Sequence, residues 1–332
     1  MARTPTRVAL ALLACLPVAL ASTASASALP DVGAAVAAAA ARLLQVGLSH
    51  ATPWPRPDRP EDLGPVPRAT TAHAAAPGPS TVPVLDLHGA ILSPGCVGTD
   101  VTAPVAGLTT VLRRHGWTGP VRGVAYYCAD SGRGAVDIRG TARPTADTNI
   151  TDIAQLLAWY VYRSYSSHGV AVDLVGHSMG GLIIRDALAG AGKRGFPPYL
   201  RVRDVVTISA PYAGIPSRSI CPLQCQQMAY GSAYLAGTSH SASPPQGRGG
   251  TMWTEIGGSP CDSIPAASTL ALRGSLRVDL GDRTPVCYTH LGYLNDSSSA
   301  RNLPATVTSP AGRVTRVTGP HSLEWVYQGL MR

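Results

Sequence analysis

Residues 173–184 read Asp-Leu-Val-Gly-His-Ser-Met-Gly-Gly-Leu-Ile-Ile, and this stretch decides the fold. The first three residues favour a β-strand, the last four open a helical pattern, and the motif G-x-S-x-G lies between them. The pentapeptide alone is weak evidence because Gly and Ser are common here, so its weight comes from the strand before it and the helix after it. Gly176 and Gly180 keep side chains out of the crowded turn. We interpret Ser178 as a nucleophile exposed at the carboxyl edge of a sheet; the alternative is a serine that caps an ordinary helix.

Strand-like and helix-like segments alternate on both sides of this stretch. Short apolar runs bounded by turn residues predict six strands, at residues 82–87, 121–127, 170–175, 202–209, 252–256 and near 276–280. Apolar residues at helical spacing predict five helices, at residues 100–115, 149–166, 179–189, near 264–273 and near 323–330. Such alternation indicates a parallel sheet with right-handed crossovers. We therefore expect an α/β fold in a single domain over residues 81–332, with about six mostly parallel strands and helices on both faces.

The beginning of the chain reads differently from the rest. Two arginines, an apolar segment and a run of small residues occupy residues 1–28 and form the pattern of a secretory signal peptide. Cys15 lies in a Leu-Leu-Ala-Cys sequence like a lipid-attachment box, but apolar sequence continues beyond it where a polar tether would be expected. Residues 29–80 are rich in Pro and Ala and read as a linker or wrapping arm. The mature chain is therefore expected to be secreted into the extracellular space.

Composition and cysteine count exclude several classes of protein. Hydrophobic residues make up 45% and charged residues 14%, unlike a disordered, highly charged chain. The net charge of +8 is spread thinly, without a run of five or six basic residues, which argues against nucleic-acid binding. Of seven cysteines, six lie outside the signal peptide, and six cysteines in an exported chain predict three disulfides. The absence of a Cys-x-x-Cys pair or matching histidine spacing argues against a metal site.

A serine nucleophile needs a base, which in this class of site follows the serine and the acid along the chain. Two of the nine histidines, His290 and His321, lie beyond the last predicted strands. His290 lies in a loop from the carboxyl side of the final strand region, whereas His321 fits the start of the terminal helix. We favour His290 as the base and keep His321 as the alternative.

The acid that orients this base is expected between Ser178 and His290. Asp262 follows the strand at 252–256, at the carboxyl edge of the sheet where the acid must stand. It would also serve as the N-cap of the helix predicted near residue 264, and the two roles are compatible. Asp279 and Asp282 are the reserve candidates.

Backbone N–H groups complete the candidate site. The N–H of Met179 directly follows the nucleophile, and the N–H of Ala90 follows His88-Gly89 at the end of the first predicted strand. Two such donors would stabilise the negative charge of a tetrahedral intermediate, as an oxyanion hole does. Chemistry of this kind requires neither a metal nor an organic cofactor, so none is expected.

Loop positions suggest how the cysteines pair. We predict the disulfides Cys96–Cys128, Cys221–Cys225 and Cys261–Cys287. The first pair follows two neighbouring strands, and the second closes a short local loop, although either of its cysteines could reach another loop. The third would tie the loop of the proposed acid to the loop of the proposed base.

Several stretches together resemble the secreted bacterial α/β-hydrolase lipases and esterases, particularly the disulfide-bearing ones. The matching stretches are His88-Gly89, Gly176 to Gly181, Ser209-Ala210-Pro211, Cys221 to Met228, Trp253 to Asp262, and Cys287 to Leu294. The resemblance implies His290 as the base and a minimal sheet that lacks the first two strands of larger hydrolases. It also implies a secreted serine ester hydrolase that cleaves lipid or other carboxylic esters through an acyl-enzyme on Ser178.

Other functions would use the same residues. An amidase, a peptidase or an acyltransferase would employ the same triad, and a non-catalytic exported binding protein on a hydrolase fold is an alternative of a different class. We expect a monomer whose partner is a lipid or small ester, with contact to a lipid–water interface and none to nucleic acid. Residues 212–250, rich in Pro, Gly and Ser, form an irregular excursion and a candidate lid.

Overall fold

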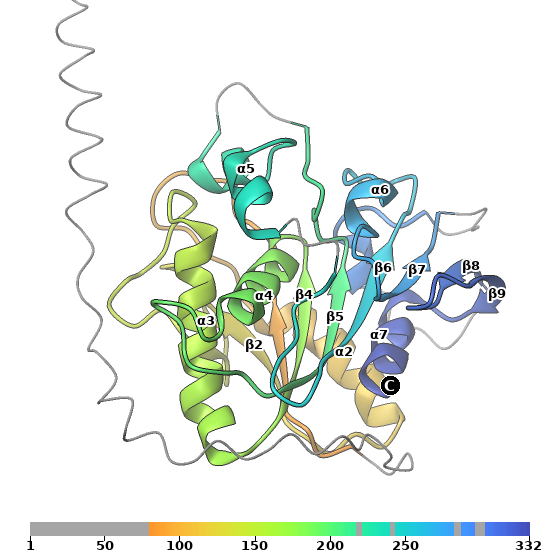
Figure 1. The fold of residues 1–332 in the computed structure, drawn as a ribbon, viewed down its shortest axis with the longest axis horizontal. Helices are drawn as coiled ribbons and strands as arrows, with labels where there is room; N and C mark the ends of the chain where they lie inside the picture. Colours follow the sequence, from red (N-terminus) through yellow and green to blue (C-terminus); the bar gives the residue numbers. More distant parts are fainter. Residues whose placement is uncertain (1–79, 217–220, 240–242, 282–286, 296–302) are drawn as a thin grey trace, which may run out of the picture. The chain divides into compact units, whose positions relative to one another are not determined.

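The computed structural model describes residues 80–216, 221–239, 243–281, 287–295 and 303–332 (Figure 1). The signal peptide predicted at residues 1–28 lies outside this part of the chain, and so does the arm predicted at 29–80 except for its last residue. Asp282, a reserve candidate for the acid, also lies outside it.

The described chain is built on one mixed sheet. Its strands are β1 (Val84–Leu87), β2 (Val121–Ala125), β3 (Val136–Asp137), β4 (Val172–His177), β5 (Val202–Ile208), β6 (Met252–Gly257), β7 (Leu276–Asp279), β8 (Leu303–Thr308) and β9 (Val314–Gly319). They lie in the order β3-β2-β1-β4-β5-β6-β7-β8-β9. Neighbours from β3 to β7 pair in parallel, whereas β7, β8 and β9 pair antiparallel. The α/β class predicted from the sequence is confirmed.

The sheet has nine strands in the described residues, not the six that the sequence predicted. All six predicted strands are present as β1, β2, β4, β5, β6 and β7. The prediction missed β3 because two residues are too short to show a pattern. It missed the hairpin of β8 and β9 because Pro304 disfavours a strand and because β9 is largely exposed, so it lacks alternation of apolar and polar residues.

Helices cover both faces of the sheet. They are α2 (Thr102–Arg114), α3 (Ile150–Ser164), α4 (Met179–Gly190), α5 (Leu223–Gln227), α6 (Ala266–Thr269) and α7 (Ser322–Leu330). Short turns of 3₁₀ helix add Ser166–His168 and Gly292–Leu294. Helices α3 and α4 pack together on one face, and α2 and α7 pack on the other (Figure 1). Residues 212–250, predicted to be irregular, contain the short helix α5.

The helix predicted near residues 264–273 is only the four residues of α6. It begins after Pro265 rather than at an Asp262 cap. It stops early because the Leu272 N–H donates to the buried Glu255 carboxylate, 3.0 Å away, instead of to a helical carbonyl. Asp262 is therefore not the N-cap of α6, and its carboxylate accepts from the Ile264 N–H in the preceding turn.

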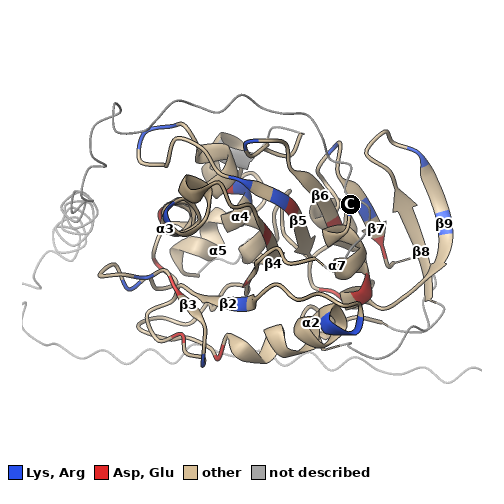
Figure 2. Ribbon diagram, turned by 90° about the horizontal axis from the view of Figure 1, so that it is seen from below, with Lys and Arg blue, Asp and Glu red and all other residues tan. Residues whose placement is uncertain are grey.

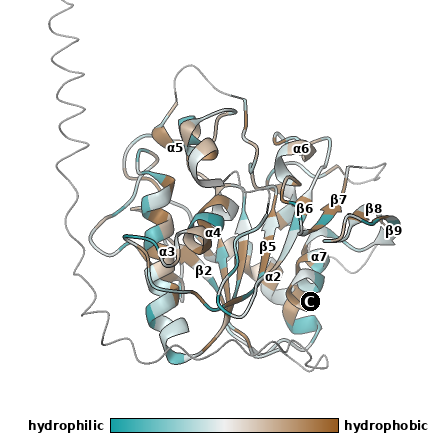
Figure 3. Cartoon of the chain, viewed as in Figure 1, coloured by the Kyte–Doolittle hydropathy of each residue, from teal (hydrophilic) through white to brown (hydrophobic). Residues whose placement is uncertain are grey.

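Strand residues alternate between two apolar cores. Val84, Val175 and Val206 face the core shared with α2 and α7. Leu85, Leu174 and Val205 face the core shared with α3 and α4. Because both faces of the central parallel strands are buried, most of their residues are apolar, and brown segments run through the central sheet (Figure 3). Asp173, Asp204 and Glu255 are buried charged exceptions.

Charged residues lie mainly outside these two cores. Seen from below, Lys and Arg occur on separate elements, among them α2, β2 and β9 (Figure 2). Within the described ranges, every helix is too short or too polar to cross a bilayer.

The strand order reverses direction between β1 and β4. In open α/β sheets, ligands bind beyond the carboxyl ends of the strands at such a point.

Candidate active site

Ser178 stands at this reversal, on the turn between β4 and α4. Its φ is +55°, in the left-handed region that a non-glycine residue rarely occupies. The turn packs tightly against β1, since a Cβ on Gly180 would lie 2.5 Å from the Leu87 carbonyl oxygen. The Ser178 N–H donates to the Ile208 carbonyl at 2.9 Å and ties the turn to the end of β5. The elbow geometry predicted for Ser178 is therefore present.

His290 and Asp262 form an ion pair beside this turn. The His290 Nδ1 lies 2.9 Å from the Asp262 Oδ1, and the Asp262 side chain is fully buried. Burial opposes ionisation of Asp262, but hydrogen bonds from His290, Ser209 and the Ile264 N–H outweigh it and hold its pKa below the usual value. Asp262 is therefore ionised at neutral pH and accepts the Nδ1 proton of His290, which leaves the other ring nitrogen free to act as a base.

Ser209 is a third partner of this pair, and the sequence reasoning assigned it no role. It directly follows β5, is fully buried, and has a φ of +49°. Its hydroxyl donates to the Asp262 Oδ2 and lies 3.2 Å from the His290 Nδ1. The only sequence signal was its place in the Ser209-Ala210-Pro211 stretch at the carboxyl end of a strand.

His177 supports the loop that carries His290. Its Nε2 donates to the His290 carbonyl oxygen at 2.7 Å, and the two rings are 4.6 Å apart. Burial, followed by the charge of His290, lowers the pKa of His177 to about 3, so its ring is neutral. A neutral ring donates from only one nitrogen, and the contact with the carbonyl shows that this nitrogen is Nε2.

The two predicted oxyanion donors lie at the same edge. Met179 is the first residue of α4, so its N–H has no partner within the helix. Ala90 follows Gly89, which approaches the nucleophile so closely that a Cβ there would lie 2.9 Å from the Ser178 Cβ and 3.3 Å from its Oγ.

The alternative site residues lie elsewhere. His321 is 1% exposed, and its Nδ1 contacts the Tyr288 hydroxyl at 3.2 Å. Asp279 accepts the Gly281 N–H at 2.8 Å. Neither residue lines the pocket that contains Ser178 and His290.

That pocket has a volume of about 360 Å³. Apart from Ser178, Ser263 and His290 its lining is apolar or sulfur-bearing: Ala90, Leu92, Pro211, Ile215, Pro216, Cys225, Met228 and Ile264. Four of these residues come from the candidate lid at 212–250, whose movement stays a prediction. The described residues contain no group of three His, Cys, Asp or Glu side chains that could hold a metal ion.

The six cysteines outside the signal peptide lie in the pairs Cys96–Cys128, Cys221–Cys225 and Cys261–Cys287, each at disulfide distance. The last pair joins the loop of Asp262 to the loop of His290, at a sequence separation of 26. Because these two loops follow different strands, the pair restrains the separation of acid and base.

The described residues form a single α/β domain with a mixed, mostly parallel sheet, and Ser178 and His290 line one pocket of it. No family model matches the chain, and no curated protein matches it. Aspergillus fumigatus lipase B is 16% identical with a TM-score of 0.43, over 64% of this chain and 49% of that chain. Phospholipase PlaB from Legionella pneumophila is 14% identical with a TM-score of 0.36, over 55% and 40%. A putative thioesterase from Silicibacter sp. is 17% identical with a TM-score of 0.32, over 53% and 57%.

The chain thus spans about half the length of the lipase and less of the phospholipase. Similarity at these TM-scores does not indicate what activity the chain has.

Proposed function

We propose that the chain is a secreted serine hydrolase that cleaves carboxylic esters through an acyl-enzyme on Ser178. One observation carries the proposal: Ser178, on a strained turn, and His290, held by the buried Asp262, open onto one apolar pocket. A strained backbone and a buried carboxylate paired with a histidine each cost free energy of folding, and such features cluster at functional sites.

The residues support a complete reaction cycle. His290 takes the proton of the Ser178 hydroxyl as its oxygen attacks the ester carbonyl carbon, and the Ala90 and Met179 N–H groups stabilise the tetrahedral oxyanion. The bond to the alcohol oxygen breaks as His290 returns the proton to that oxygen. Water, deprotonated by His290, then attacks the acyl-enzyme and releases the acid. Asp262 stays ionised throughout and holds the imidazole in position.

The pocket favours an apolar acyl or alcohol group. Its walls include Leu92, Ile215, Met228 and Ile264, so burying a hydrocarbon group there would exclude water from both surfaces. Leu92 is 41% exposed and Leu291, next to His290, is 63% exposed, which suits contact with a lipid–water interface. The substrate class we propose is therefore a lipid or another carboxylic ester with an apolar acyl chain.

Labelling with a fluorophosphonate probe and release of p-nitrophenol from acyl esters of increasing chain length test the proposal. Ser178→Ala should lose both labelling and hydrolysis while remaining folded. Labelling without ester hydrolysis would redirect the assignment to an amidase, a peptidase or an acyltransferase. Absence of labelling in the folded wild-type protein would indicate a binding protein on a hydrolase fold.

The base is tested by comparing two histidines. His290→Ala should lose nearly all activity, by about 10⁴-fold or more as for other triad members, whereas His321→Ala should keep most of it. The reverse ranking would move the base to the start of α7.

Secretion is supported by the three cysteine pairs, since disulfides persist mainly in oxidising compartments. The signal pattern at residues 1–28 gives the route. Fractionation of the producing cells, with N-terminal sequencing of the exported chain, should find protein that begins near residue 29 outside the cytoplasm. Protein retained there with its first 28 residues would contradict the proposal.

A further inference from the structure

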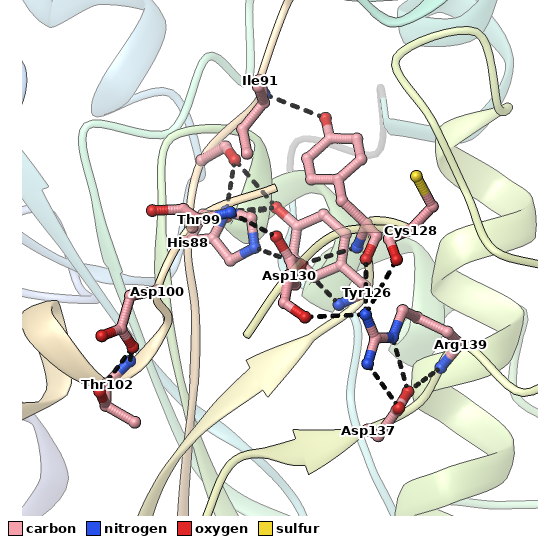
Figure 4. A network of polar contacts seen from close by, with 12 residues as sticks. His88, Ile91, Thr99, Asp100, Thr102, Tyr126, Cys128, Asp130, Asp137 and Arg139 are labelled. Atoms are coloured by element: carbon pink, nitrogen blue, oxygen red, sulfur yellow. Dashed lines mark hydrogen bonds and ion pairs between the residues drawn. The ribbon is translucent and has the colours of Figure 1, made fainter. Parts of the chain in front are cut away.

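The Gly89 carbonyl oxygen is held by two side chains. The His88 Nδ1 donates to it at 2.8 Å, and the Tyr126 hydroxyl lies 3.0 Å from it (Figure 4). The same hydroxyl donates to the His88 carbonyl at 2.6 Å, so its proton lies between two consecutive carbonyl groups. The loop after β1 is thereby fixed at both of its first two peptide groups.

The orientation of this carbonyl decides where the Ala90 N–H points. Both belong to one trans peptide group, so they point in opposite directions. Ala90 lines the pocket that contains Ser178, and within the described part of the chain its N–H has no acceptor. We propose that His88 and Tyr126 are positioning residues that hold the Gly89–Ala90 peptide with its N–H toward the substrate's carbonyl oxygen. This inference rests on the proposed ester hydrolysis.

His88 is itself held by a buried carboxylate. Its Nε2 lies 3.0 Å from the Asp130 Oδ2, and its ring stacks on the Tyr126 ring at 4.2 Å with a 6° interplanar angle. The two ring nitrogens of His88 therefore face hydrogen-bond acceptors on opposite sides, a backbone carbonyl oxygen and a carboxylate oxygen. The His88 ring cannot turn over without losing these contacts.

Asp130 is the centre of a backbone network. Its carboxylate accepts the N–H groups of Thr99 at 3.0 Å, Tyr126 at 2.8 Å and Tyr127 at 2.7 Å. Burial opposes its ionisation, but the hydrogen bond and charge of His88, together with backbone N–H groups, hold the pKa of Asp130 below its usual value. Asp130 is thus a fixed negative charge that anchors His88.

Arg139 closes the network from the other side (Figure 4). Its Nη1 donates to the carbonyls of Tyr127 at 3.2 Å, Cys128 at 3.1 Å and Asp130 at 2.8 Å. Cys128 pairs with Cys96, so the loop that carries Asp130 is tied to the loop after β1. A loop that only connected two elements would not need this number of restraints.

We call the hydrogen bonds of His88 and Tyr126 to the Gly89 carbonyl the clamp. Its loss would let the Gly89–Ala90 peptide turn over. Its carbonyl oxygen would then face the developing oxyanion, and one of two donors would be lost. Removal of one oxyanion donor costs about 10²- to 10³-fold in kcat. Because the donor acts on the transition state rather than on the bound ester, kcat should fall while KM changes little.

Two substitutions of His88 separate the clamp from general support of the fold. His88→Asn places an amide N–H where Nδ1 stood and loses the contact with Asp130. His88→Gln places an amide where Nε2 stood and loses the donor to Gly89. Tyr126→Phe removes the second donor. Tyr199→Phe is the matched control, since among the described residues its hydroxyl bonds only to the remote Ser166 carbonyl, at 3.4 Å.

The assay is kcat and KM for p-nitrophenyl butyrate, together with the Ki of butylboronic acid, whose tetrahedral adduct places an oxygen in the oxyanion hole. His88→Gln should lower kcat and weaken the boronate by the same factor, about 10- to 100-fold, with KM nearly unchanged. His88→Asn should retain more activity than His88→Gln, Tyr126→Phe should lose about threefold to tenfold in kcat, and Tyr199→Phe should behave as wild type.

Equal losses in His88→Asn and His88→Gln, or losses in KM instead of kcat, would overturn the clamp. Wild-type kcat in Tyr126→Phe and His88→Gln would do the same. If His88→Gln does not fold, Tyr126→Phe carries the test. An active wild-type enzyme with unaffected variants contradicts only the clamp, whereas an inactive, unlabelled wild-type protein overturns the proposed function and the clamp together.

Discussion

Ser209→Ala removes one of three groups that hold the Asp262 carboxylate. The Ser209 hydroxyl donates to Oδ2, whereas Oδ1 accepts from His290 and from the Ile264 N–H, both at 2.9 Å. A hydrogen bond to a charged group contributes about 1.5–3 kcal/mol. Complete loss of this free energy from the transition state would lower the rate by about 10- to 150-fold. Because two donors remain on Oδ1, we expect about a tenfold fall in kcat for p-nitrophenyl butyrate.

The same substitution should change how stability depends on pH. The folded pKa of Asp262 is lowered, so its stabilisation is complete above the unfolded value near 4 and is lost as pH falls through the folded value. Ser209→Ala moves the folded pKa back toward its ordinary value. The stability deficit of the variant should therefore be largest above about pH 5 and shrink toward pH 3.

Urea unfolding at several pH values measures this deficit, and initial rates measure kcat. Ser166→Ala is the control, because Ser166 is equally buried and its hydroxyl accepts the Arg201 N–H at 2.8 Å, away from the site. It should lose stability without losing kcat. Wild-type kcat in Ser209→Ala, with a deficit that does not vary with pH, would refute the role of Ser209.

Two further predictions concern the close approach of β1 and the cysteine pairs. Gly89→Ala should lower kcat by at least about 10²-fold in a folded protein, because its Cβ would lie 2.9 Å from that of Ser178 and displace the Ala90 N–H; rates within threefold of wild type would contradict this. Replacing both Cys261 and Cys287 by alanine should cost about 3.5 kcal/mol of stability, against about 2 kcal/mol for the short Cys221–Cys225 loop, as measured by urea unfolding. Equal costs would show that loop length does not set the effect.

The main elements of the fold could be predicted from the sequence because their signals are local. The strands β1, β4, β5 and β6 are buried on nearly their whole length, so each reads as a short, mainly apolar run. The elbow at Ser178 is visible because Gly, Ser and the flanking patterns lie within twelve residues. The hairpin of β8 and β9 was not predictable in this way, since its polar edge strand is stabilised by pairing with a neighbour rather than by burial.

For the candidate site too, local sequence signals could be used for prediction and long-range contacts could not. Chain order and the positions of the strand ends indicate Ser178, Asp262 and His290 as candidates. The contacts that orient them could not be predicted, because Ser209 meets Asp262, His177 meets His290 and Asp130 meets His88, and the members of each pair lie far apart in sequence.

Sequence alone therefore determined the class of fold, the strained serine and the candidate acid and base, because propensity, apolar period and turn chemistry act over a few residues. Tertiary structure alone decided which carboxylate meets which histidine, how the Gly89–Ala90 peptide is turned, and what lines the pocket. These depend on loops from separate strands that meet at one edge of the sheet, and their meeting is set by sheet order and long-range packing.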